Sequence, residues 1–123
     1  MICSISLFAC SILIFFFLNR SFAHASSADA RERGATAFHT KGCESCHSIT
    51  GVGGDRAPDL GSVGQRRKTD QIRAQILKGS KSMPPFEGVL SKDEVKDLVA
   101  FLTSCRTDVA PGCRAWTASS NPQ

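Results

Sequence analysis

The sequence predicts an all-α fold in which three to five short helices and loops wrap around a bound prosthetic group. Apolar residues recur at helical spacing in three stretches, at residues 29–41, 69–79 and 91–105, and no stretch shows the alternation of a β-strand. After the first stretch comes the run Cys43-Glu44-Ser45-Cys46-His47, which has the form C-x-x-C-H. This pentapeptide is the attachment signature of a c-type haem. A covalently held haem would supply the centre of the core in so small a chain.

The motif gives a role to each of its reactive side chains. Because Cys43 and Cys46 lie three positions apart on one side of a helical turn, both thiols can add to the vinyl groups at one edge of a porphyrin. His47 is then held beneath the iron as its proximal ligand. Zinc sites and redox dithiols also use C-x-x-C, but the chain has no second C-x-x-C, no H-x-x-x-H and no alternation of strands and helices. We therefore predict one covalently bound haem c.

The first 25 residues have the composition of a signal peptide. Ile5 to Leu18 form a run of 14 mostly apolar residues, whereas a membrane span needs about 20. The small residues of Ala23-His24-Ala25 resemble a cleavage site, with the cut after Ala25. No Lys or Arg precedes the run, so an uncleaved membrane anchor remains an alternative, and a lipid-bearing Cys10 is a weaker one. We expect export to the periplasm, where c-type haem is attached, and contact with a membrane only if the leader is retained.

The remaining chain is the size of one small domain. Removing 25 of the 123 residues leaves 98, which we divide into a haem domain at 26–105 and a C-terminal tail at 106–123. Without Arg20, 14 Lys and Arg residues oppose 11 Asp and Glu residues, a net charge of +3 that two haem propionates would bring close to neutral. No dense basic face is indicated, so we expect no nucleic-acid partner, and we expect a monomer.

The helix before the motif is expected to lead directly into it. Asp29 is a possible N-cap, and Glu32 stands three positions later in the reciprocal arrangement of a capping box. Residues 48–64 contain five Gly, one Pro and two Asp without periodicity, and are expected to be a loop. A loop of this length without structure of its own is uncommon unless it wraps something, here the haem edge.

Two further helices follow the loop. Thr69 is expected to cap the second, which ends near Gly79, and Ser91 the third, where Glu94 completes a capping box. One side of the third helix is expected to be buried, because apolar residues recur there at spacings of three, four and seven: Val95, Leu98, Val99, Leu102 and Cys105.

Two cysteines remain for the end of the domain. In an oxidising compartment Cys105 and Cys113 would pair and close a short loop, tying the tail to the last helix. Free or intermolecular thiols are the alternative, because sequence alone does not prove pairing. The rest of the tail is expected to be unstructured.

The second axial position of the iron has few candidates. Met83 is the only Met left after removal of the leader, and it lies 36 residues beyond His47, far enough for the chain to return on the other face of the haem. Pro84 and Pro85 restrict the backbone beside it. The alternatives are a core-filling Met83 with an open iron, or His39, which stands on the approach helix and is expected to be exposed or packed.

With these pieces in place, the chain resembles the class I c-type cytochromes, small bacterial monohaem electron carriers. Besides the motif, the match includes Gly34 and Phe38 on the first helix and the run Leu98 to Leu102 on the last, two helices that cross at a close Gly and aromatic contact in that family. Ala57-Pro58-Asp59-Leu60 looks like the family's Pro-x-Leu segment. The resemblance implies that the Pro58 carbonyl accepts a hydrogen bond from His47, and that Met83 belongs to the distal segment. The two late cysteines and the tail depart from the family pattern.

The expected function is electron transfer without catalysis of a reaction. Iron held by His47 and Met83 has no open position for a substrate, and Met ligation raises its potential. The alternatives are a five-coordinate haem enzyme or gas sensor, and a cytochrome subunit held by a larger oxidoreductase through the tail from Arg106. Basic side chains could form a ring that steers an acidic redox partner, although scattered surface charges explain them equally well. They are Lys41, Lys78, Lys81, Lys92, Lys96 and the run Arg66-Arg67-Lys68.

Overall fold

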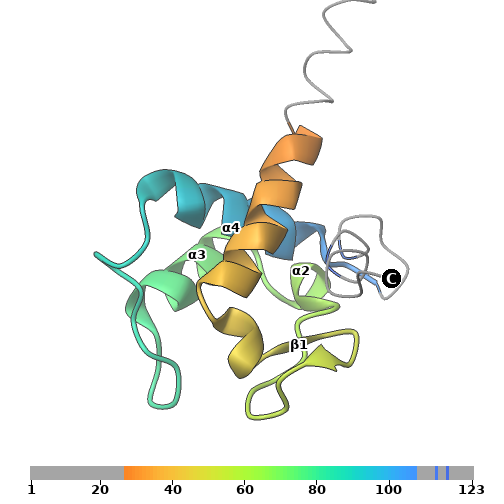
Figure 1. Cartoon of the computed structure of the whole chain (residues 1–123), viewed down its shortest axis with the longest axis horizontal. Coiled ribbons are helices and arrows are strands. Elements are labelled where there is room, and N and C mark those ends of the chain that lie inside the picture. Colours follow the sequence, from red (N-terminus) through yellow and green to blue (C-terminus); the bar gives the residue numbers. More distant parts are fainter. Residues whose placement is uncertain (1–26, 108–112, 114–115, 117–123) are drawn as a thin grey trace, which may run out of the picture.

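The computed structural model describes residues 27–107, 113 and 116. A first helix over residues 27–40 is followed by five elements before the last helix (Figure 1). In chain order these are the 3₁₀ turn η1 (Cys43–Ser45), strands β1 (Ser48–Ile49) and β2 (Val52–Gly53), helices α2 (Val63–Arg66) and α3 (Thr69–Lys78), and finally α4 (Lys92–Ser104). The predicted all-α fold is confirmed, with one tiny two-stranded sheet added to it. The predicted signal peptide at 1–25 lies outside the described residues.

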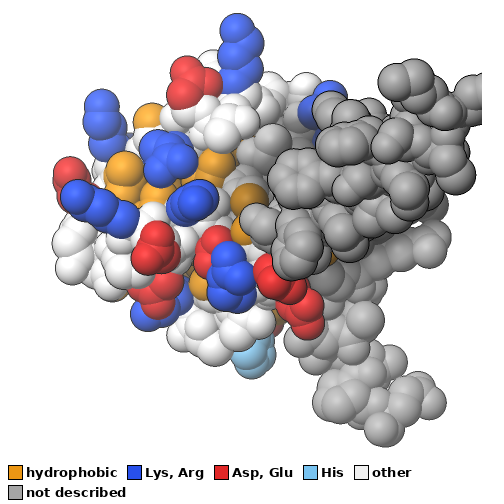
Figure 2. Space-filling model, turned by 90° about the horizontal axis from the view of Figure 1, so that it is seen from above, with side chains coloured by type: hydrophobic (Ala, Val, Ile, Leu, Met, Phe, Trp, Pro, Cys, Tyr) orange, Lys and Arg blue, Asp and Glu red, His pale blue; other side chains and the backbone are white. Residues whose placement is uncertain are grey.

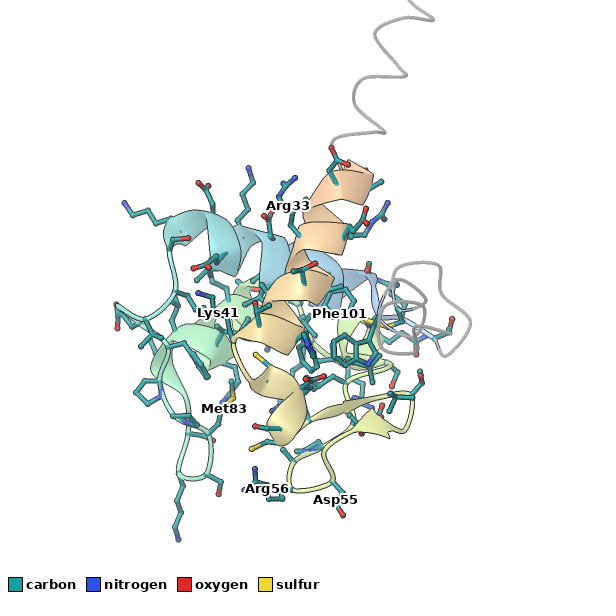
Figure 3. All side chains as sticks on the ribbon, viewed as in Figure 1. Arg33, Lys41, Asp55, Arg56, Met83 and Phe101 are labelled. Atoms are coloured by element: carbon teal, nitrogen blue, oxygen red, sulfur yellow. A yellow bond between two sulfur atoms is a disulfide. The ribbon has the colours of Figure 1, made fainter. Side chains whose placement is uncertain are left out.

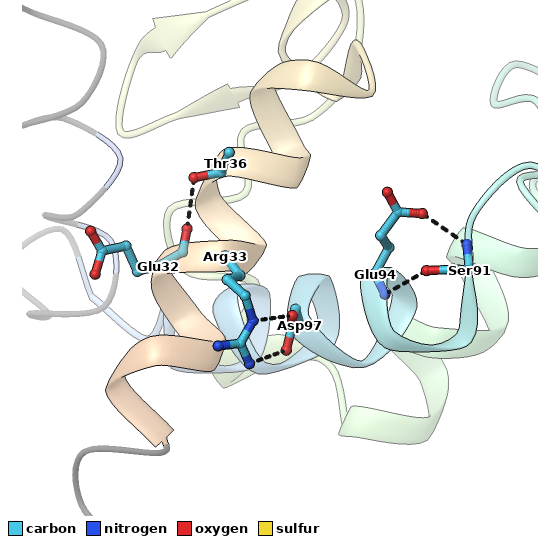
Figure 4. Close-up of polar contacts among 6 residues, drawn as sticks. All are labelled: Glu32, Arg33, Thr36, Ser91, Glu94 and Asp97. Atoms are coloured by element: carbon cyan, nitrogen blue, oxygen red, sulfur yellow. Dashed lines mark hydrogen bonds and ion pairs between the residues drawn. The ribbon is translucent and has the colours of Figure 1, made fainter.

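The first helix crosses α4 at a glycine. Gly34 lies so close to α4 that a Cβ at this position would collide with the backbone oxygen of Asp97 and lie 2.6 Å from the Cβ of Phe101. Below the crossing, the rings of Phe38 and Phe101 pack with centroids 5.9 Å apart. Arg33 adds a two-pronged ion pair, with its Nε 2.7 Å and its Nη2 3.1 Å from the two Asp97 carboxylate oxygens (Figure 4). The two helices are therefore held at the crossing by close packing and charge.

Helix α4 begins as the sequence predicts. The Glu94 backbone N–H donates to Ser91 Oγ at 3.2 Å, and the Ser91 N–H donates to Glu94 Oε2 at 2.8 Å, which completes the capping box (Figure 4). Lys41, just after the first helix, pairs with the other Glu94 oxygen at 2.8 Å. The predicted apolar face of α4 is buried, together with Phe101 and Asp97. This face forms the centre of the core, against which Ile72 and Ile76 of α3 also pack.

Two predicted helix caps are wrong. Asp29 lies inside the first helix, which is already helical at residue 27, because the alanine-rich sequence around it favours continuing the helix. In α3 the N-cap is Lys68 and Thr69 is the first helical residue. The side chain of Gln71 accepts a hydrogen bond from the Lys68 N–H at 2.9 Å. A residue within the helix therefore supplies the hydrogen-bond partner for the backbone N–H at the N-terminal end of α3.

The loop predicted at 48–64 contains structure of its own. Ser48 pairs with Gly53 and Ile49 with Val52 in an antiparallel hairpin, and α2 begins at Val63. The two residues between the strands, Thr50 and Gly51, both have positive φ, 52° and 82°, as a tight hairpin turn requires. Thr favours this conformation poorly, which is why the sequence pattern did not indicate a hairpin.

The tail is more ordered than predicted at its two described residues. Cys113 and Trp116 are both 1% exposed, and the Trp116 ring packs edge-on against Phe38 with centroids 5.1 Å apart. The Cys113 and Cys105 sulfurs lie at bonding distance, 2.09 Å, with Cα atoms 5.1 Å apart. The tail thus contributes the large aromatic side chain of Trp116 to a core with few other aromatic side chains. In the described part of the chain, no helix combines the length and the apolar character needed to cross a membrane.

Candidate functional site

The C-x-x-C-H motif forms a tight turn at the end of the first helix. Gly42 ends that helix with φ 77°, a left-handed conformation that glycine adopts without strain. The N–H groups of Cys46 and His47 then both donate to the Cys43 carbonyl, at 3.2 and 3.0 Å. Both cysteines are half-buried free thiols on this one turn. The local structure therefore presents two thiols together with an imidazole directly after them, as the motif predicts.

Cys43 faces the apolar interior. Burial raises the pKa of its thiol to about 11, because a thiolate would lose its hydration there. At neutral pH this side chain is accordingly a neutral thiol that packs with the core.

The imidazole of His47 contacts the loop that follows the hairpin. Its Nδ1 lies 2.8 Å from the carbonyl oxygen of Pro58, the geometry that the family resemblance implies. A carbonyl oxygen only accepts, so Nδ1 carries the proton in this contact and Nε2 is left as the free nitrogen. A ring held in this tautomer is suited to bind a metal through Nε2.

Asp59, the residue after Pro58, is a hydrogen-bond acceptor for three groups. Its Oδ2 accepts from Ser48 Oγ at 2.7 Å and from the Gly51 N–H at 2.9 Å, and its Oδ1 accepts from the Gly61 N–H at 2.8 Å. Partial desolvation acts against ionisation of this carboxyl group, but the hydrogen bonds outweigh it and the pKa of Asp59 is lowered. Sequence reasoning missed this cluster. The Asp59 to Gly61 bond is an Asx turn, which Pro-Asp-Leu-Gly could have indicated.

His47 and Met83 line one apolar crevice. Its cavity volume is about 30 Å³. Besides these two residues, its walls consist of Phe38, Cys43, Leu60, Ile76, Phe86, Leu90, Leu98 and Leu102. The walls therefore hold one imidazole and one thioether as metal-binding groups, with a thiol at the side and hydrocarbon elsewhere.

A constrained loop after α3 holds Met83. Gly79 ends α3 with φ 64°, and a Cβ there would collide with the Met83 carbonyl oxygen. That oxygen accepts a hydrogen bond from the Ser80 N–H at 2.8 Å, which closes the loop. The Met83 side chain is half-buried and lies on the inner side of the loop (Figure 3), with its Sδ 3.7 Å from Gln75 Nε2. The sequence did not indicate the role of Gln75, because it stands on the exposed side of α3.

The residues of the crevice fit a c-type haem. The fit rests on the donor set: two thiols on one turn, an imidazole with a free Nε2, and a thioether from a distant loop, all around an apolar space. Thioether and imidazole are soft to intermediate donors of the kind that haem iron accepts. An apolar lining suits the faces of a porphyrin.

Of the other residues considered from sequence, His39 is exposed and pairs with Glu44, at 2.5 Å between Nδ1 and Oε1, outside the crevice. Lys41 is paired with Glu94. Arg66 donates to Ser62 Oγ at 2.8 Å and to the Asp59 carbonyl oxygen at 3.0 Å, so it supports the loop beside His47.

Comparison with known proteins decides the family. Residues 29–102 match the protein family described as cytochrome C oxidase, cbb3-type, subunit III. The matched region contains the motif, the hairpin, the Met83 loop and α4, and it is more than half of the chain. The chain belongs to this cytochrome c family. Membership implies haem c as the cofactor of the domain and electron transfer as its general role.

Curated relatives of the cytochrome domain are of several kinds. The chain is 36% identical over 74 residues to cytochrome c-555 of Methylococcus capsulatus, and the match covers 59% of this chain and 60% of that protein. It is 36% identical over 86 residues to a cytochrome bc1 complex cytochrome c subunit of Corynebacterium efficiens, covering 65% of this chain and 27% of the relative. A nitric oxide reductase subunit of Stutzerimonas stutzeri is 34% identical over 85 residues, covering 60% of this chain and 57% of the relative. The chain thus spans from about a quarter to three fifths of these relatives. No solved structure matches at a comparable level.

Proposed function

We propose that the chain is an exported monohaem c-type cytochrome that carries single electrons between redox partner proteins. The observation that carries the proposal is the crevice, where the His47 imidazole and the Met83 thioether line the same apolar space. Cys43 and Cys46 would hold one haem through thioether bonds, and His47 and Met83 would be the two axial ligands of its iron. When bound, haem c supplies a one-electron Fe(II)/Fe(III) couple.

The chain's own residues would suit this task by holding ligands in place. With His47 on one side and Met83 on the other, the iron would have no open position, so the protein would be a carrier and not an enzyme. The Pro58 carbonyl orients His47, while Gly79 and Ser80 constrain the Met83 loop. Buried Phe38, Leu98 and Leu102 keep water from the interior of the crevice. Apolar surroundings and Met ligation both favour a raised potential.

Export would account for two further features of the sequence. A signal peptide at residues 1–25 would deliver the chain to the periplasm, with a retained anchor as the alternative. That compartment is oxidising and would permit a disulfide between Cys105 and Cys113. The 5.1 Å separation of their Cα atoms supports the pairing.

Redox partners would meet an uneven distribution of charge. Residues 66–81, which include α3 and lead to the Met83 loop, carry six basic residues and one acidic residue. The rest of the described range 27–107 carries seven basic and nine acidic residues. Figure 2 shows the side that is uppermost in Figure 1, that of the first helix and α4, where Lys and Arg side chains stand around hydrophobic ones with carboxylates beside them. The α3 side would therefore steer an acidic partner toward Met83.

A second candidate function is that of a cytochrome subunit in a larger oxidoreductase. The names of two relatives support it, because one is a subunit of a bc1 complex and the other a subunit of nitric oxide reductase. Affinity purification of the tagged chain from its native host separates the two roles. Stoichiometric recovery of other oxidoreductase subunits would favour the complex, and recovery of the chain alone would favour the free carrier.

Carbon monoxide tests the ligand assignment. The reduced wild-type protein should not form a carbonyl adduct promptly at neutral pH, whereas Met83→Ala should bind carbon monoxide and show a lower midpoint potential. Val89→Ala is the matched control, since Val89 is 65% exposed in the same loop. Prompt binding by the wild type would instead support a five-coordinate haem enzyme or sensor.

A further inference from the structure

We propose that Asp59 is the positioning residue that holds the Pro58 carbonyl against the His47 imidazole and so tunes the proximal ligand. The inference rests on the proposed role of His47 as an iron ligand. It assigns to Asp59 an effect on the potential that acts through Pro58, without contact between Asp59 and the iron.

The contacts form a closed ring. The chain runs from His47 to Ser48, whose Oγ donates to Asp59 Oδ2 at 2.7 Å, and from Asp59 back to Pro58, whose carbonyl oxygen lies 2.8 Å from His47 Nδ1. A second bond, from the Leu60 N–H to the Ser48 carbonyl at 2.8 Å, runs parallel to it. The donor and the acceptor of the imidazole hydrogen bond are therefore attached to each other through the Asp59 carboxylate.

The geometry of the peptide group between Pro58 and Asp59 explains why the carboxylate matters. This group carries the carbonyl that accepts from His47, and the proline ring restricts only its N-terminal side. On the other side, the Asp59 side chain accepts three hydrogen bonds, and its backbone oxygen accepts a fourth from Arg66 Nη2 at 3.0 Å. Loss of the carboxylate would leave that side held mainly by Arg66 and the Leu60 bond, and the carbonyl could turn away.

A turned carbonyl would change the ligand. The hydrogen bond that Nδ1–H donates increases the electron density of the ring and the basicity of Nε2, which favours Fe(III). Weakening this bond should therefore raise the midpoint potential. It should also expose the His47 Nδ1 proton to exchange with solvent.

The experiment compares variants of the full-length holoprotein by two measurements. The first is the midpoint potential, and the second is the rate at which the His47 Nδ1 proton, seen by proton NMR, exchanges in D₂O. Asp59→Ala should raise the potential and accelerate exchange roughly tenfold, as expected for losing about 1.4 kcal/mol of hydrogen-bond restraint. Ser48→Ala should shift both in the same direction by less. This variant keeps the charge of Asp59 and keeps the inference testable if Asp59→Ala does not fold.

Asp55→Ala is the matched control, because it removes a carboxylate from the same loop. Asp55 is exposed at the tip (Figure 3), and no hydrogen bond or ion pair of its side chain is found within residues 27–107. It should leave proton exchange unchanged. Equal exchange rates in Asp59→Ala, Ser48→Ala and the wild type would overturn the inference, even with a shifted potential, since charge alone would then explain the shift. If the wild type lacks a His47 ligand signal, the proposed function fails first and the inference falls with it.

Discussion

Gly34 of the first helix lies directly against the backbone of Asp97 in α4, at a distance that excludes any side chain. The crossing at this point sets how near the two helices approach above the crevice. It also brings Phe38 against Phe101 and Arg33 against Asp97. The position of the C-x-x-C-H turn, which follows the first helix, thus depends on the absence of a side chain at Gly34.

Gly34→Ala should destabilise the protein by about 1–3 kcal/mol, because the added methyl forces the helices apart. Urea unfolding followed by circular dichroism measures this loss. Thr36→Ala, on the exposed side of the same helix, should change stability by less than about 0.5 kcal/mol. A stable Gly34→Ala variant with unchanged unfolding would show that the crossing is looser than the structure indicates.

Gln75→Leu should lower the midpoint potential. The Gln75 amide lies 3.7 Å from Met83 Sδ, and with Met83 as the proposed iron ligand, its donation to the sulfur would weaken the sulfur as an electron donor to Fe(III). A neutral hydrogen bond contributes about 0.5–1.5 kcal/mol, which corresponds to about 20–60 mV for one electron. Protein-film voltammetry measures the shift, with Gln65→Leu as control, because Gln65 is an exposed glutamine on the neighbouring helix α2. An unchanged or higher potential in Gln75→Leu would contradict the role given to this amide.

Replacing Cys105 and Cys113 together by Ala should lower the free energy of unfolding by about 2–3 kcal/mol. The cysteines are eight positions apart, and a short closed loop of this size restricts the unfolded chain by that amount. Thermal unfolding with and without reductant measures the effect. Reductant should destabilise the wild type and leave the double variant unchanged. Equal sensitivity of both proteins would mean that the thiols are not paired in solution.

Stability below pH 5 should depend on Glu94. The hydrogen-bonded ion pair with Lys41, helped by the Ser91 N–H, lowers the pKa of Glu94 from 4.5 to about 2. A lowered pKa in the folded state means that this contribution is present above about pH 4.5 and is lost as the pH falls toward 2. Glu94→Gln should therefore flatten the dependence of the unfolding free energy on pH within this window.

Glu87→Gln is the control for Glu94. Glu87 is exposed in the loop before α4, and no side-chain hydrogen bond or ion pair of it is found in the described chain. In this variant the unfolding free energy should depend on pH as steeply as it does in the wild type. A Glu94→Gln protein with the same slope as the wild type would show that other carboxylates govern acid unfolding.

The sequence alone predicted the features that depend on neighbouring residues. The C-x-x-C-H spacing, the capping box of Ser91 and Glu94 and the apolar face of α4 are local patterns, because one helical turn or one helix face defines each of them. The Met83 loop was predicted as part of the site because the only Met left after removal of the predicted leader stands beside two prolines. His47 and Pro58 were brought together only by the family resemblance, since no local rule connects them.

Only the tertiary structure revealed features whose partners are distant or whose local preference is weak. Thr50 adopts a positive φ because the Asp59 carboxylate binds the Gly51 N–H of the same turn, which offsets an unfavourable local conformation. Trp116 is buried because Phe38, 78 positions earlier, offers it an aromatic surface. Local propensity therefore determined the helices and the C-x-x-C-H turn, whereas packing and hydrogen bonds between distant residues decided how the His47 imidazole is held.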